Sequence, residues 1–197
     1  SLVGSEMCIR DSFKPMVIGT FIMVATYSLF YIMTAFAQAY SRTPATLSEA
    51  GYPMGLGIPA NTFTGLLLMS AIVFAIFISI SGLYADKIGR RKWLIWTTVS
   101  ILIFALCMPL FLGNGTPASV FAFLVIGMAL MGMTFGPMAA LLPELFPTEV
   151  RYSGASLAYN IASIIGATIA AMISLKINAL YGLMGVGIYL AINAFLT

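Results

Sequence analysis

The sequence WLIWTTVSILIFALCMPLFLGNGTPASVFAFLVIGMALMGMTFGPMAALLP, residues 93–143, runs for 51 residues without a charge. One helical membrane crossing needs only about 20 apolar residues, because each residue adds 1.5 Å to a helix. Residues 113–117, GNGTP, interrupt the run with a composition typical of a turn. The run therefore predicts two membrane helices, at about 93–112 and 118–142.

Four further uncharged runs cover the rest of the chain: 15–41, 50–85, 152–175 and 177–197. The run 50–85 opens with alternating glycines and prolines, which indicate a loop, so only about 62–84 suits a helix. The sequence therefore predicts an all-α membrane protein with six transmembrane helices, at about 15–40, 62–84, 93–112, 118–142, 153–175 and 179–197.

The composition agrees with a membrane protein. Of 197 residues, 61% are hydrophobic and 8% are charged, against about 25% charged in ordinary soluble domains. The absence of histidine excludes histidine metal sites and Ser-His catalysis, and two cysteines cannot build a zinc site. The net charge of +3 does not indicate a basic surface for binding nucleic acid. We expect no metal, no cofactor, no nucleic-acid partner and no enzymatic activity.

The two ends of the chain differ from the rest. Residues 1–12, SLVGSEMCIRDS, lack the apolar core of a signal peptide, and we expect no helix there. Residues 7–11 resemble a translated library adapter, so we interpret 1–12 as an adapter-derived or otherwise non-native lead. Residues 13–197 then form the six-helix domain. Its last crossing is still apolar at Thr197, which we interpret as a C-terminal truncation.

The basic residues predict an orientation, because cytosolic loops carry an excess of Lys and Arg. A cytosolic N-terminus of the six-helix unit places six of them inside and two outside, leaving out Arg10. The inside set is Lys14, Lys87, Arg90, Arg91, Lys92 and Arg151, and the outside set is Arg42 and Lys176. Trp93 follows the basic run directly, as an aromatic anchor at the membrane interface would.

Two short loops on the predicted cytosolic side concentrate the acidic residues. The first, residues 82–92, reads GLYADKIGRRK. We expect Gly82 to allow close helix approach and Gly89 to allow a tight turn. A carboxylate such as Asp86 at the membrane surface is costly unless it is paired, and Arg90 and Arg91 follow within one or two helical turns. The alternative is a basic turn that only sets topology.

The second loop, residues 143–156, reads PELFPTEVRYSGAS. Pro147 holds the turn, while Glu144 and Arg151 flank it seven residues apart. We expect these two residues to face the first loop and to form with Asp86 and Arg90 a latch between conformations. The alternative is solvated loop charge, which contributes about 0–1 kcal/mol per exposed pair.

These loops resemble signatures of the major facilitator superfamily. GLYADKIGRRK resembles the loop after the second helix of each six-helix half, and Glu144-x6-Arg151 resembles the motif between the fourth and fifth helices. PELFPTEVRYSGASLAYN, residues 143–160, and FYIMTAF, residues 30–36, are most similar to the metabolite:H+ symporter branch. Departures from the branch pattern lie near the cavity or the gate, at Met138, Pro143, Glu149, Ala158 and Asn160.

The resemblance implies the C-terminal half of a twelve-helix transporter, whose N-terminal half is missing here. It implies alternating access for a small polar solute, an organic acid or betaine-like metabolite, in the bacterial inner membrane. Proton coupling is implied by the branch alone. Two alternatives stay open: a sugar-porter-type transporter, because Glu-x6-Arg occurs there too, and a self-contained six-helix channel-like protein.

No predicted crossing contains a charged residue in its interior, so polar side chains are the candidates for solute contact. Tyr27, Tyr31 and Gln38 share one helical face of the first crossing, and Asn160 lies on the fifth. We predict that these four line the cavity, and the alternative is that they only bond neighbouring helices together. Small and hydroxyl residues, including Gly132, Gly136 and the face formed by Gly154, Ala158, Ala162 and Gly166, are expected to pack helices together.

Overall fold

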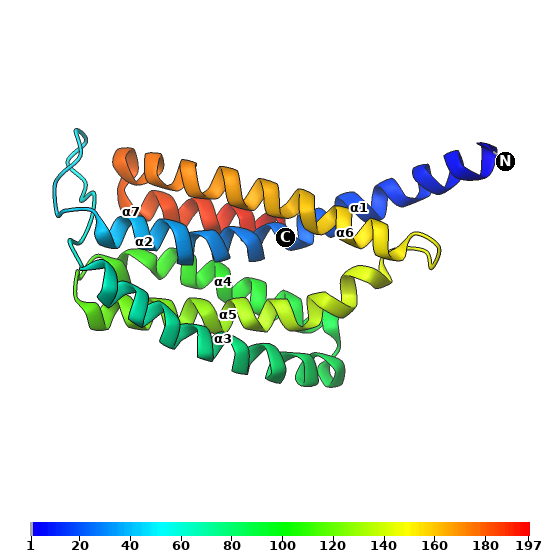
Figure 1. Ribbon diagram of the computed structural model, residues 1–197, viewed down its shortest axis with the longest axis horizontal. Coiled ribbons are helices and arrows are strands. Elements are labelled where there is room, and N and C mark those ends of the chain that lie inside the picture. Colours follow the sequence, from blue (N-terminus) through cyan, green and yellow to red (C-terminus); the bar gives the residue numbers. More distant parts are fainter. Residues whose placement is uncertain (1) are drawn as a thin grey trace.

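The computed structural model describes residues 2–197, with side chains from Phe13 onward except that of Ala167. Helices make up most of this range and are joined by short turns and by one longer loop, residues 43–59 (Figure 1). The segments are α1 (Leu2–Tyr31), the π-helix η1 (Ile32–Phe36), α2 (Ala37–Arg42), α3 (Ala60–Ile88), α4 (Arg90–Leu112), α5 (Pro117–Glu144), α6 (Arg151–Ile164), the π-helix η2 (Ile165–Ile169) and α7 (Ala170–Leu196).

These segments form six passes through the bundle. The first is continuous from Phe13 to Arg42, and α3, α4 and α5 form the next three. α7 breaks at Gly182, where φ is 71° and ψ is −170°, and the chain reverses there (Figure 1). The fifth pass therefore runs through α6, η2 and the first part of α7, and the sixth is the rest of α7. Within the described residues, five helices are long and apolar enough to span a membrane, because α7 counts as one helix although it belongs to both the fifth and the sixth pass.

The expectation of a non-helical lead is wrong for the described residues, because α1 begins at Leu2. Extending an existing helix costs far less free energy than nucleating a new one. A segment with weak helix propensity can therefore be helical when it adjoins a membrane helix. The N-terminal part of α1 projects beyond the bundle (Figure 1).

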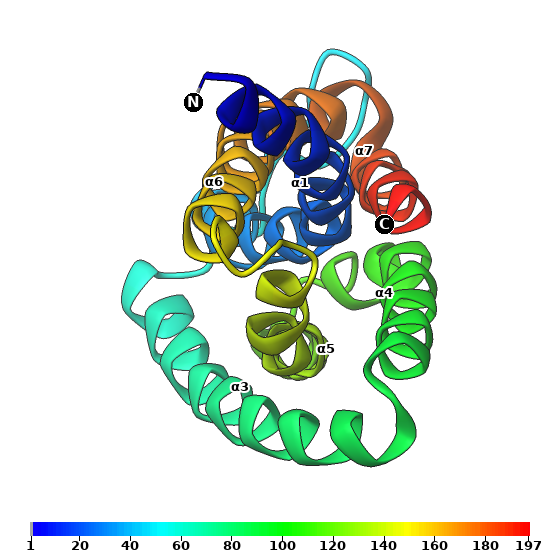
Figure 2. The ribbon, with the colours of Figure 1, turned by 90° about the vertical axis from the view of Figure 1, so that its right-hand side faces the viewer.

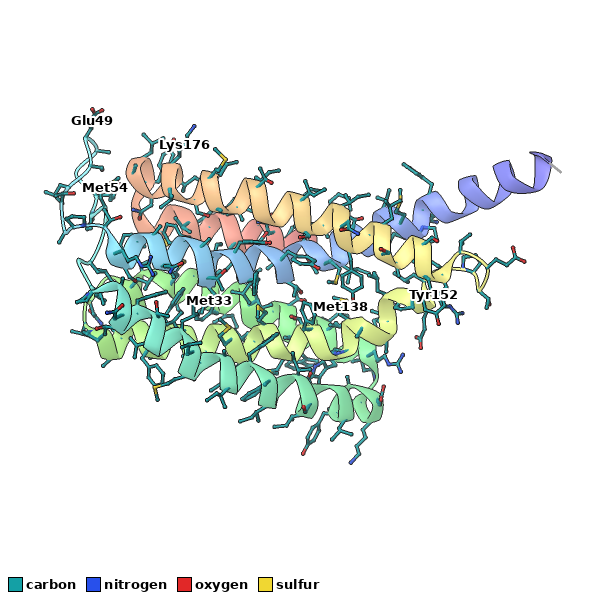
Figure 3. All side chains as sticks on the ribbon, viewed as in Figure 1. Met33, Glu49, Met54, Met138, Tyr152 and Lys176 are labelled. Carbon is teal, nitrogen blue, oxygen red and sulfur yellow. The ribbon has the colours of Figure 1, made fainter. Side chains whose placement is uncertain are left out.

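The bundle has two opposite ends, which we name by their loops. The basic end carries the α3–α4 turn and the α5–α6 turn, and the hairpin end carries residues 43–59. Glu49 and Lys176 lie at the hairpin end, and Tyr152 lies at the basic end (Figure 3). The alternating passes bring the two loops singled out in the sequence to the same end.

The helices pack in two groups. α3 lies against α5, whereas α1 lies against α6 and α7, and α4 contacts both α5 and α7 (Figures 1 and 2). A larger buried cluster includes Phe36, Tyr40 and Phe123. A smaller one includes Met23, Met138 and Phe146. Met33 and Met138 point into the space between the helices (Figure 3).

Glycines on α5 set the distance to α3. A Cβ at Gly132 would lie 2.9 Å from the Phe74 carbonyl oxygen, and one at Gly136 would lie 2.8 Å from that of Ile78. The Ser81 hydroxyl donates a 3.0 Å hydrogen bond to the Gly132 carbonyl across this contact. The predicted packing role of Gly132 and Gly136 is confirmed. The expectation for Gly82 is wrong, because a Cβ there would meet nothing within 4 Å; the glycines on α5 provide the room.

Small residues on α6 and η2 make the contact with α1. Ala158 and Ala162 are fully buried. A Cβ on Gly166 would lie 3.2 Å from the Tyr27 carbonyl carbon. The predicted small-residue face is therefore a packing surface, as expected from sequence.

Large apolar side chains cover the outside of the bundle. Only 11% of the most apolar 18-residue stretch of α3 is buried inside the bundle. Leu68, Ile72 and Leu83 are each more than 60% exposed. Such a continuous apolar surface is not stable in water. The protein is an integral membrane protein with an all-α bundle, as predicted.

Candidate functional site

The turn between α3 and α4 places Asp86 and Arg90 side by side. α3 ends at Ile88 and α4 begins at Arg90, so Gly89 alone makes the turn, with φ at 103°. L side chains rarely adopt this conformation, which explains a glycine at this point. Asp86 and Arg90 lie four residues apart on either side of the turn, and Arg90 Nε donates to Asp86 Oδ1 at 2.9 Å.

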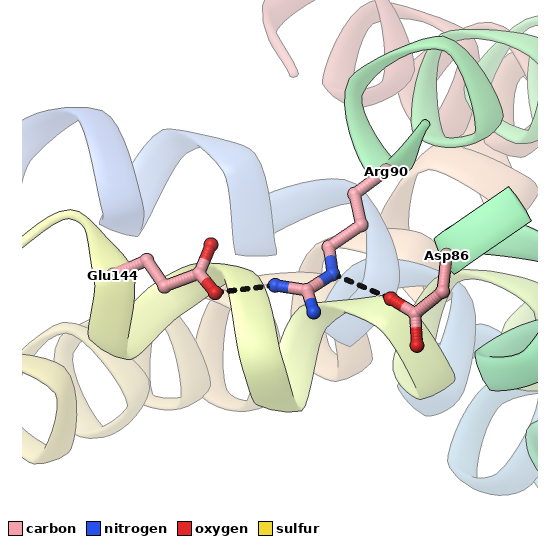
Figure 4. Close-up of polar contacts among 3 residues, drawn as sticks. All are labelled: Asp86, Arg90 and Glu144. Atoms are coloured by element: carbon pink, nitrogen blue, oxygen red, sulfur yellow. Dashed lines mark hydrogen bonds and ion pairs between the residues drawn. The ribbon is translucent and has the colours of Figure 1, made fainter. Parts of the chain in front are cut away.

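The end of α5 supplies a second carboxylate to the same guanidinium. Arg90 Nη1 donates to Glu144 Oε1 at 2.5 Å, across 54 residues of sequence (Figure 4). Arg90 therefore bridges the two loops, because a planar guanidinium can donate in two directions at once. We call Asp86, Arg90 and Glu144 the charge cluster.

The charge cluster is accessible to solvent. The side chains of Asp86 and Glu144 are 63% and 58% exposed, and that of Arg90 is 28% exposed. Water and salt screen such pairs, so each contributes little to stability. Interactions this weak can shift a conformational equilibrium without locking the protein in one conformation.

Arg151 lies outside the charge cluster. It is the first residue of α6, as the sequence suggested, but no ion pair joins it to a carboxylate among the described residues. Its Nε is buried without a hydrogen-bond partner. The structure thus brings together three of the four residues predicted to form the latch. Pro147 lies in the α5–α6 turn, where the Val150 amide donates to its carbonyl, and Arg91 is exposed beside the cluster.

The four cavity candidates lie on the first and fifth passes. Tyr27, Tyr31 and Gln38 are half-buried, whereas Asn160 is exposed. The Asn160 amide donates to the Ser156 carbonyl of its own helix at 2.8 Å. Tyr31 packs edge-on against Phe30, with ring centroids 5.1 Å apart. The structure shows no hydrogen bond among these four side chains within its described part.

The π-helix η1 changes the predicted polar face of the first pass. That face requires a regular helix from Tyr27 to Gln38. A π-bulge adds one residue to a turn, which rotates the residues after it by roughly 100° relative to an uninterrupted helix. Gln38 is therefore out of register with Tyr27 and Tyr31, and the single face predicted from sequence is wrong.

Three polar contacts between distant segments were missed in the sequence, two between helices and one between a helix and the loop of residues 43–59. Asn193 Nδ2 donates to Ser28 Oγ, Asn178 Nδ2 donates to the Pro53 carbonyl, and the Trp93 indole donates to the Met133 carbonyl. The two asparagines could have been singled out in the sequence, because polar side chains within membrane helices commonly form hydrogen bonds to neighbouring segments. The interpretation of Trp93 as an interfacial anchor gave no reason to expect its bond to α5. Among the described side chains, no group of three His, Cys, Asp or Glu could hold a metal ion.

An apolar six-pass bundle with charged turns joined at one end defines a polytopic α-helical membrane protein. The family profile described as Major Facilitator Superfamily matches residues 6–171, so the chain belongs to that superfamily. This confirms the family suggested by the two loops.

Named relatives agree with this assignment. A Haemophilus influenzae protein, provisionally named as a metabolite transport protein, is 86% identical over 184 residues, covering 93% of this chain and 42% of the relative. The Escherichia coli inner membrane metabolite transport protein YhjE is 53% identical over 183 residues, covering 92% of this chain and 40% of the relative. The Salmonella typhimurium proline/betaine transporter is 27% identical over 175 residues, covering 88% and 32% respectively.

The chain thus spans about two fifths of the length of the first two relatives. A comparison with solved structures gave no match.

Proposed function

We propose that this chain is the C-terminal half of a secondary transporter that moves a small polar metabolite by alternating access. The bridge from Asp86 through Arg90 to Glu144 carries the proposal, because it ties α3, α4 and α5 together at one end of the bundle. Alternating access requires contacts that hold one conformation and loosen in another. Exposed ion pairs have the necessary weakness.

We place the basic end in the cytosol of a bacterium, with the transporter in the inner membrane. Six of the eight basic residues considered from residue 13 onward belong to that end, and Arg42 and Lys176 belong to the other. The positive-inside tendency favours this orientation. The Escherichia coli relative bears an inner-membrane name, which supports the same location.

The proposed solute is an organic acid or a betaine-like metabolite, and its uptake is coupled to protons. The proline/betaine name of a distant relative supports this class of solute. Tyr31, Gln38 and Asn160 offer hydrogen bonds but no charge. The charge of the solute and the coupling proton are therefore handled by groups outside the six passes described here, consistent with a site shared between two halves.

The relatives' length favours a half-transporter over a self-contained six-helix channel, since this chain matches only about 40% of them. The test uses the complete transporter that contains this chain, reconstituted in liposomes. Labelled organic acids, betaines and sugars are offered with and without an inward proton gradient. Saturable, gradient-dependent uptake of an acid or betaine is expected. Uptake of sugars alone, or passive flux that does not saturate, would contradict the proposal.

A further inference from the structure

A second candidate site lies in an apolar groove at the basic end, beside the charge cluster but lined by none of its three residues. The groove encloses about 720 Å³ between α1, α4, α5 and the last residues of α7. Figure 2 shows the end of α7 beside α1 and α4. Ligand pockets commonly have volumes of roughly 300–1,000 Å³.

The groove has a cation at one end and an apolar interior. Arg91 lines it at the start of α4, and the same face of α4 continues through Leu94 and Thr98 to Leu102. Eleven residues of helix separate Arg91 from Leu102, which is about 16 Å. This length is close to half the hydrocarbon thickness of a bilayer, about 30 Å. The groove therefore spans one leaflet, starting at the level of the lipid headgroups.

Arg91 is available to an anion. Its neighbour Arg90 takes both carboxylates of the charge cluster, and no ion pair of Arg91 occurs among the described residues. No aspartate or glutamate side chain lines the groove. Trp96 lies one helical turn from Lys92 and is 73% exposed, as expected of an aromatic side chain at a membrane interface.

We propose that this groove binds an anionic phospholipid, with the phosphate at Arg91 and an acyl chain along α4. The charge of Arg91 and the apolar length together fit an amphiphile, and a small polar solute would leave most of the groove wall uncovered. The groove is distinct from the proposed transport site, because none of Tyr27, Tyr31, Gln38 and Asn160 lines it. The proposal does not depend on which face of the membrane is cytosolic.

Two matched pairs of variants test this in the complete transporter. Arg91→Gln removes the cation of the groove, while Lys92→Gln removes an exposed neighbouring cation that does not line it. Val99→Trp fills the groove, while Ile103→Trp adds the same bulk on the exposed surface of the same helix. Each protein is equilibrated with equal amounts of phosphatidylglycerol and phosphatidylcholine of identical acyl chains, and retained lipid is counted by native mass spectrometry.

The wild type and Lys92→Gln should retain phosphatidylglycerol about fivefold over phosphatidylcholine, the preference expected from one basic residue. Arg91→Gln should bring that ratio close to one. Val99→Trp should retain less of both lipids than Ile103→Trp does. Added glycerol phosphate, which has no acyl chain, should not displace the retained lipid. Equal retention of the two lipids by the wild type, equal ratios in Arg91→Gln and Lys92→Gln, or full lipid retention in Val99→Trp would overturn the proposal. Full lipid retention in Val99→Trp would mean that protein, and not lipid, occupies the groove. If Val99→Trp does not fold, the comparison of Arg91→Gln with Lys92→Gln still tests the proposal. The readout is retained lipid and not uptake, so it is independent of the proposed transport function.

Discussion

Asn193 Nδ2 donates a 3.1 Å hydrogen bond to Ser28 Oγ, which joins the first and the last pass of the bundle. Both side chains are buried, at 9% and 1% exposure. The Thr197 hydroxyl adds a second link between the same two passes, because it donates to the Phe21 carbonyl at 3.0 Å. The two passes are therefore held by polar contacts as well as by packing.

We predict that Ser28 and Asn193 are energetically coupled. Each alanine variant should lower the free energy of unfolding by about 1 kcal/mol, and the double variant should show a coupling energy of about 0.6 to 1.7 kcal/mol. Denaturant unfolding of the complete transporter in detergent measures this cycle. Ser79→Ala is the control, because that exposed hydroxyl bonds only to its own helix. Strictly additive losses would mean that the bond contributes nothing.

We predict that neutralising the charge cluster slows transport. Asp86→Asn and Glu144→Gln should each reduce the uptake rate several-fold, up to about fivefold per pair, because each removes an exposed ion pair to Arg90. Expression and equilibrium binding of solute should change little. Initial uptake rates in liposomes check this.

The control for this prediction is Glu149→Gln, since Glu149 is an exposed acid of the same end without an ion pair among the described residues. If all three variants transport at the wild-type rate, the cluster serves only topology. Restored rate in Arg90→Glu combined with Glu144→Arg would support the direct contact.

We predict that Asn160 binds solute. Its amide is exposed and bonded only within α6, so it can turn toward a ligand at little cost. Asn160→Ala should raise the half-saturation constant for uptake by about three- to tenfold, the loss expected from one hydrogen bond of about 1 kcal/mol. Tyr31→Phe and Gln38→Ala are measured beside it.

Asn114→Ala is the matched control for Asn160, because Asn114 is an exposed asparagine whose amide also bonds to a carbonyl four residues earlier, that of Leu110. It lies in the α4–α5 turn at the hairpin end. Unchanged uptake constants in the Asn160, Tyr31 and Gln38 variants would assign those side chains to helix packing instead.

We predict that the hairpin end is accessible from outside the cell. Single cysteines replace the exposed residues Glu49 and Lys92 in a background that carries Cys8→Ser and Cys107→Ser. An impermeant maleimide should label position 49 in intact cells, and position 92 only after lysis. Labelling of position 92 but not 49 in intact cells would reverse the proposed orientation.

Hydrophobic length and turn chemistry in the sequence were sufficient for the class of fold and the number of passes. An uncharged run of 51 residues can only be two crossings, and its GNGTP break lies where α4 ends and α5 begins. Gly89 was also predictable, because a tight turn between two membrane helices needs a residue that tolerates positive φ. Such features are local, so they can be read from neighbouring residues.

Only the tertiary structure decided which polar residues meet. Arg90 and Arg151 look equally suited to Glu144 in the sequence, yet the fold gives the contact to Arg90 and leaves Arg151 apart. The π-helix at Ile32–Phe36 rotates Gln38 away from a face that regular periodicity had assigned to it. Asn193 finds Ser28 because the last pass returns beside the first. Contacts between passes depend on rotation and depth of each helix, and these are set by packing against neighbours that the linear pattern does not contain.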